Sequence, residues 1–92
     1  MSRQRMTVFY SGRVQGVGFR YTVKSLTPGF ELTGTVRNLD DGRVELVAEG
    51  EREELDAFRQ AIRESGLGRM IQREEEIFGP ANGQIRGFEI VR

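Results

Sequence analysis

The 92-residue sequence has no cysteine, no histidine and no tryptophan, and only two prolines. Without cysteine the chain forms no disulfide, no zinc site with thiolate ligands and no cysteine nucleophile. Without histidine it lacks the side chain that enzymes most often use as a general base near neutral pH. The composition therefore excludes many classes of enzyme.

Long apolar segments are also missing. The first residues, MSRQRMTV, lack the apolar stretch of a signal peptide, and no segment approaches the roughly 20 apolar residues of a membrane span. We therefore expect a cytoplasmic protein with no membrane partner. A chain of this length has the size of one domain, and we expect a single domain over residues 1–92.

The charges balance overall but are unevenly distributed. Fourteen basic and fourteen acidic residues give a formal net charge of zero, which argues against a protein that binds nucleic acid by neutralising its phosphates. Residues 1–43 carry seven basic and three acidic side chains, whereas residues 44–92 carry seven and eleven. This asymmetry predicts positive potential in the first half of the chain, which suits a small anion.

Residue patterns divide the chain into five extended and two helical segments. The first helix should end near Thr27, because Pro28 disfavours helical geometry in the residue before it. The Asp41-Gly42 pair between two β-rich segments predicts a tight hairpin turn. The predicted strands are residues 7–14, 32–38, 43–50, 69–78 and 87–91, and the predicted helices are residues 18–26 and 51–65.

This order of elements predicts an α+β fold of the ferredoxin-like type, a split βαβ arrangement with a short C-terminal strand. We expect an antiparallel sheet with both helices on one face. Leu55, Phe58 and Ile62 share one face of the second helix and are predicted to be buried. The acidic run Glu74–Glu76 reads as a solvated edge strand, because alternation along one strand cannot direct all three carboxylates to one metal.

The segment GRVQGVGFR, residues 12–20, contains three glycines and two arginines. A glycine loop that leads from a strand into a helix directs several backbone N–H groups at one point, where the helix N-terminus adds partial positive charge. No Ser, Thr, Asp or Asn lies between Arg13 and Phe19 to cap the helix, so donors of its first turn are left for a ligand. Arg20 could complete an anion cradle with its planar guanidinium. The alternative is a tight connection with no ligand.

GRVQGVGFR is followed, fourteen residues after Arg20, by GTVRNLDDGRVE. These two segments closely resemble the signature of the acylphosphatases, and the likeness extends over nearly the whole chain. The resemblance implies hydrolysis of acyl phosphates to a carboxylate and inorganic phosphate, with no metal or organic cofactor. It also implies a water positioned by Asn38 and a phosphate bound by Gln15, Gly16, Val17, Gly18, Phe19 and Arg20.

Neighbouring side chains are expected to have other roles. Alternation along the strand sends Arg37 to the face opposite Asn38, where it would be solvated. Phe19 and Tyr21 are expected to pack into the sheet. The chain departs from the family pattern at Thr35, where an aromatic residue is common, and at the TPGFE segment after the first helix. These departures concern packing more than the cradle.

Two other functions remain open from the sequence. A regulatory domain could keep the same fold and anion cradle without catalysis. An RNA reader of ferredoxin-like type needs exposed aromatic residues on its central strands and net positive charge, and TVRNL and RVELV contain no aromatic residue. The preferred hypothesis is a monomeric enzyme whose only partner is a small acyl phosphate.

Overall fold

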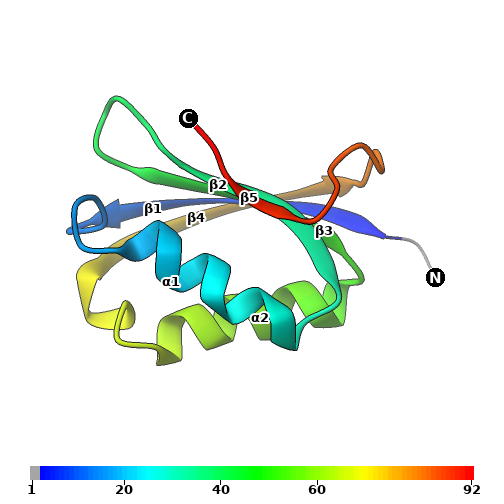
Figure 1. The fold of residues 1–92 in the computed structure, drawn as a ribbon, viewed down its shortest axis with the longest axis horizontal. Coiled ribbons are helices and arrows are strands. Elements are labelled where there is room, and N and C mark those ends of the chain that lie inside the picture. Colours follow the sequence, from blue (N-terminus) through cyan, green and yellow to red (C-terminus); the bar gives the residue numbers. More distant parts are fainter. Residues whose placement is uncertain (1–2) are drawn as a thin grey trace.

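The structure, a computed structural model, describes residues 3–92 and contains a five-stranded sheet with two helices on one face (Figure 1). The strands lie in the order β4-β1-β3-β2-β5. The elements are β1 (Gln4–Gly12), α1 (Phe19–Leu26), β2 (Leu32–Asn38), β3 (Val44–Gly50), α2 (Arg52–Glu64), β4 (Ile71–Pro80) and β5 (Phe88–Ile90), with short 3-10 helices at Thr27–Gly29 and Gly68–Met70.

The ferredoxin-like fold predicted from the sequence is confirmed, with one difference in the sheet. β1, β2, β3 and β4 pair in antiparallel fashion, whereas β5 pairs in parallel with β2. The chain reverses after β4, so β5 runs opposite to β4 and therefore in the direction of β2. The sheet is mixed, not antiparallel throughout. Neither α1 nor α2 has the length and apolar character that a helix needs to cross a bilayer.

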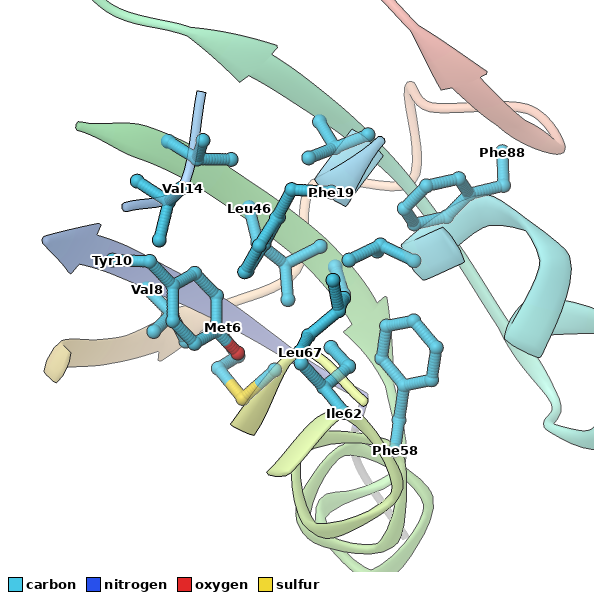
Figure 2. Packing of buried hydrophobic residues seen from close by; sticks show 14 of the residues in the cluster. Met6, Val8, Tyr10, Val14, Phe19, Leu46, Phe58, Ile62, Leu67 and Phe88 are labelled. Atoms are coloured by element: carbon cyan, nitrogen blue, oxygen red, sulfur yellow. The ribbon is translucent and has the colours of Figure 1, made fainter. Parts of the chain in front are cut away.

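The core lies between the sheet and the helices, as Figure 2 shows. Alternate residues of β1 and β3 project toward the helices and are fully buried, as alternation along a strand requires. The predicted face of α2 is buried against them. The rings of Tyr10 and Phe19 lie 5.1 Å apart between their centroids. This contact joins the start of α1 to the middle of the sheet.

The segment between β2 and β3 forms a longer turn than predicted. The backbone N–H of Leu39 donates to the Arg43 carbonyl, and that of Gly42 donates to the Leu39 carbonyl. Three residues, not the Asp41-Gly42 pair alone, therefore lie between the closing residues. Gly42 has a φ of 95°, which an L-residue rarely adopts, and this explains why glycine stands at the end of the turn.

The acidic run in β4 is not simply a solvated edge. Glu74 faces α2, where its carboxylate accepts hydrogen bonds from Arg59 at 2.8 Å and Arg63 at 2.7 Å. Burial alone would raise the pKa of Glu74, but these two guanidinium groups outweigh it and hold the pKa below its usual range. Glu76 also pairs with Arg59, whereas Glu75 lies on the exposed side. The expectation failed for Glu74 because its partners come from another element.

A buried carboxylate holds the connection between β4 and β5. Glu49 is completely buried and accepts hydrogen bonds from Arg5 Nε at 2.8 Å and from the backbone N–H groups of Asn82 and Gly83 at 3.1 Å. Burial raises the pKa of this carboxyl, but the three donors outweigh it and keep the pKa below its usual value of 4.5. The ionised form therefore stabilises the fold.

Replacing this carboxylate by an amide is expected to destabilise the protein. At pH 7, Glu49→Gln should lower the free energy of unfolding by about 2 kcal/mol, because charge-assisted hydrogen bonds are lost. The lowered pKa makes the wild-type advantage complete above pH 4.5 and lost as the pH falls through the pKa of folded Glu49, so the two proteins should converge in acid. Urea unfolding of both proteins across this range measures the difference. The exposed Glu89→Gln is the control, and an equal loss in that variant would contradict the assignment.

Candidate active site

The loop between β1 and α1 is held at both ends by buried side chains. Val14 and Phe19 are 1% and 2% exposed and point into the core (Figure 2). The residues between them remain at the surface. Gly16 and Gly18 have φ values of 77° and 76°, a left-handed conformation that favours glycine. A Cβ atom at either position would meet no other group within 4 Å. Glycine is therefore favoured here by the backbone conformation and not by a lack of space for a side chain.

The backbone N–H groups of this loop have no hydrogen-bond acceptor in the described part of the chain. Within residues 3–92, none of the N–H groups from Gln15 to Arg20 donates a hydrogen bond to another protein group. Gly18 is the N-cap of α1, and no side chain caps the helix, as the sequence predicted. Free amides that follow left-handed glycines at a helix N-terminus form a concave donor surface. We call residues 15–20 the cradle loop.

Arg20 adds a positive charge that pairs with no carboxylate of residues 3–92. Several basic residues in the first half of the chain pair with acidic ones, including Arg5 with Glu49 and Arg37 with Glu45. In the part of the chain that the structure describes, Arg20 forms no such pair. It lies in the first turn of α1 and is half-buried. A guanidinium in this position is available to an anion at the cradle loop.

Asn38 is the last residue of β2 and projects from the helix-bearing face of the sheet. It alternates with the buried residues Gly34 and Val36, and its register partner is the buried Val44. Its Oδ1 atom is buried and has no hydrogen-bond partner among the residues that the structure describes. An unpartnered buried amide oxygen carries a desolvation cost of about 1–3 kcal/mol, which a bound water would relieve. Arg37, by contrast, lies on the opposite face and donates to Glu45 at 2.8 Å.

Gln15 joins the cradle loop to the strand end that carries Asn38. Its Nε2 atom donates to the carbonyls of Leu39 at 2.8 Å and Arg43 at 2.9 Å. The loop and the β2–β3 turn lie at the same end of the sheet (Figure 1). The sequence does not reveal this bridge, because its acceptors are backbone carbonyls, which every residue carries. The Gln15 side chain is thus occupied, while its backbone N–H remains free.

Two neighbouring aromatic residues behave differently from each other. Phe19 is buried as predicted, but Tyr21 is 72% exposed, so the expectation that it packs into the sheet was wrong. Phe19 and Val23 form the buried face of α1, and a residue two positions from Phe19 points away from that face. Thr35 lies on the face of the sheet opposite the helices, where it pairs in register with Val47 and Glu89. Its departure from the family pattern therefore leaves the helix-bearing face unchanged.

Known proteins share the sequence pattern and the fold of this chain. The family described as Acylphosphatase matches residues 6–90. An acylphosphatase from Acaryochloris marina is 42% identical over 86 residues, which cover 89% of this chain and 87% of the relative. The crystal structure of acylphosphatase from Bacillus subtilis is similar with a TM-score of 0.87 at 34% identity and covers 97% of this chain and 99% of that one. The structure of an acylphosphatase from Coxiella burnetii is similar with a TM-score of 0.80 at 30% sequence identity. That match covers 98% of this chain and 94% of the other.

These matches extend over nearly the whole chain in both sequence and structure. The resemblance seen in GRVQGVGFR and GTVRN is confirmed, and with it the prediction of an acylphosphatase. The chain belongs to the acylphosphatase family.

Proposed function

We propose that this protein hydrolyses acyl phosphates with the cradle loop and Arg20 as the phosphate site and Asn38 as the group that orients the attacking water. The observation that carries the proposal is that backbone N–H donors and a side-chain oxygen acceptor both remain without hydrogen-bond partners in this part of the described structure. Within residues 3–92, the N–H groups of residues 15–20 have no protein partner, and the Asn38 Oδ1 atom is buried without one. Gln15 holds these two parts of the structure together.

The reaction needs little beyond positioning and charge stabilisation. Water attacks phosphorus in line with the acyl oxygen, the bond between phosphorus and that oxygen breaks, and the carboxylate leaves with the electron pair. A carboxylate is a weakly basic leaving group, so no general acid has to protonate it, and a site without histidine suffices. The loop amides and Arg20 neutralise the phosphoryl oxygens. The proton of the water passes to a phosphate oxygen or to solvent.

Asn38 acts through geometry, since an amide has no useful basicity at neutral pH. Its Oδ1 atom would accept a hydrogen bond from the water and fix the oxygen in line with the bond that breaks. Holding the water in this position turns a reaction between two separate molecules into a step within one complex, which lowers the activation barrier. The same hydrogen bond would satisfy the otherwise unpartnered oxygen. The proposed role therefore also accounts for the unpartnered oxygen.

The proposal is tested with benzoyl phosphate as substrate. We expect hydrolysis well above the spontaneous rate, with competitive inhibition by inorganic phosphate. Phenyl phosphate should be a poor substrate, because its phenolate leaving group is more basic and the site offers no acid. Phosphate binding without turnover would favour the alternative, a regulatory anion-binding domain. Tight and salt-dependent binding of single-stranded RNA would instead support the RNA-reader hypothesis.

We extend the proposal to a single-domain monomer that works in the cytoplasm. The edge strands of the sheet are β4 and the three-residue β5. The central residues of β4, Arg73 to Glu76, carry four consecutive charges. Charged residues on an edge strand disfavour pairing with a second copy. Sedimentation equilibrium should therefore give the mass of one chain, and the mass of two chains at micromolar concentration would contradict this part of the proposal.

A further inference from the structure

The Gln15 side chain binds two carbonyls that already close the β2–β3 turn. The Arg43 carbonyl also accepts the N–H of Leu39 at 2.8 Å, and the Leu39 carbonyl accepts the N–H of Gly42 at 3.2 Å. Each carbonyl therefore accepts two hydrogen bonds, one from within the turn and one from Gln15. Asp41 strengthens the same turn by accepting from the N–H and the Nε of Arg43 at 3.1 and 2.9 Å. The bridge thus ends on a turn that has several hydrogen bonds of its own.

Both acceptors lie next to the strand end that carries the water-orienting group. Leu39 follows Asn38 directly, and Arg43 precedes Val44, the register partner of Asn38. On the other side of the bridge, the backbone of Gln15 begins the row of free N–H groups. The two hydrogen bonds of the bridge span 24 and 28 residues of sequence and join the cradle loop directly to the turn between β2 and β3. A displacement of one element relative to the other would change the distance between phosphate and water.

The loop has few other constraints. Its ends are held by the buried Val14 and Phe19, and by the Arg13 N–H, which donates to the Met70 carbonyl at 3.0 Å. Between them, Gly16 and Gly18 allow the backbone more conformations than any other residue would. Within residues 3–92, the side-chain amide of Gln15 is the only side-chain group of the cradle loop that hydrogen-bonds to another element. Its loss would leave the phosphate donors present but not fixed relative to Asn38.

We propose that Gln15 is a positioning residue, whose side-chain amide fixes the phosphate cradle relative to the water held by Asn38. This inference rests on the proposed function and assigns to the side chain a role different from phosphate binding. It predicts an effect on turnover that exceeds the effect on phosphate affinity, because the N–H donors and Arg20 remain in place. It also predicts that Gln15 acts through Asn38, so that the two residues are coupled.

The test is a double-mutant cycle with Gln15→Met and Asn38→Ala. Methionine has nearly the shape of glutamine but donates no hydrogen bond. With benzoyl phosphate, Gln15→Met should lower kcat on the order of 10- to 100-fold, because misplacing reacting groups by about an ångström has effects of that size. The inhibition constant of inorganic phosphate should change less than about threefold. In the Asn38→Ala background the same substitution should lower kcat by no more than about threefold.

Controls separate this role from a loss of structure. Gln60→Met removes another side-chain amide, which donates to Glu64 on the exposed side of α2, and should leave kcat and KM unchanged. Far-UV circular dichroism verifies folding of each variant. If Gln15→Met does not fold, Gln15→Asn replaces it, because asparagine keeps the amide but is one methylene too short to bridge both carbonyls.

Two results would overturn the inference. One is an equal loss of kcat in both backgrounds, which would place the effect of Gln15 in the cradle itself. The other is a weaker affinity for phosphate with kcat unchanged. The proposed function fails separately, when Asn38→Ala alone retains full turnover whatever Gln15 does.

Discussion

Arg20→Ala is expected to lower kcat/KM for an acyl phosphate by a factor on the order of 10³, equivalent to about 4 kcal/mol of transition-state stabilisation. Arg20 is the half-buried guanidinium at the start of α1, and the described chain supplies it with no ion-pair partner. Its charge therefore forms no ion pair that stabilises the described fold, and its removal should leave the free energy of unfolding nearly unchanged. Steady-state kinetics and inhibition by inorganic phosphate measure the loss.

The chain offers a matched control for this variant. Lys24→Ala removes the same charge from the same helix, one turn further along and at an exposed position. It should change kcat/KM by no more than about twofold, because an exposed charge at that distance is screened by salt. Arg20→Lys keeps the charge but loses the two-pronged geometry and should recover only part of the activity. Equal losses in Lys24→Ala and Arg20→Ala would show that net charge, and not a specific contact, supports phosphate binding.

The second large effect is expected for Asn38→Ala, which should lower kcat on the order of 10²- to 10³-fold while the inhibition constant of phosphate stays within about threefold. The substitution removes the orientation of the water but leaves all the phosphate donors in place. Because Asn38 Oδ1 hydrogen-bonds to no other protein group within residues 3–92, its removal breaks no such bond of the fold and should leave the free energy of unfolding nearly unchanged. Kinetics and urea unfolding of the same preparation measure both quantities.

The neighbouring residue on β2 provides the control for Asn38. Arg37→Gln changes a side chain on the opposite face, where it pairs with Glu45, and should leave kcat within about twofold of the wild type. A large loss of stability in Asn38→Ala, with a proportional loss of phosphate binding, would contradict the water-orienting role. That result would mean that the asparagine supports the end of β2 instead of the reaction.

Local patterns were enough to predict most of the fold. The strand predicted at residues 32–38 has the same bounds as β2 in the structure. The helix predicted at residues 51–65 is one residue longer at each end than α2, Arg52–Glu64. These elements were predictable because strand alternation and helical periodicity are properties of consecutive residues. The exposure of Tyr21 could have been predicted from the same periodicity, since it lies two positions from the buried Phe19.

Contacts between distant segments were not predictable in this way. Glu74 alternates onto the helix-bearing face of β4, but only the packing of α2 against that strand brings Arg59 and Arg63 to its carboxylate. The parallel pairing of β5 with β2 likewise depends on where the connection after β4 returns to the sheet. Each of these features requires the strand order, which no local pattern contains.

The order of the elements, the glycines that give the cradle loop its conformation, and the positions of Arg20 and Asn38 in two recognisable motifs follow from the residues alone. Which polar groups remain without partners depends on the packed fold. The register of β2 and β3 buries Asn38 Oδ1 unpaired, and the turn that joins them presents two carbonyls to Gln15. Hydrogen bonds across more than twenty residues depend on the packed sheet, and for that reason the link between cradle and water appears only in the folded protein.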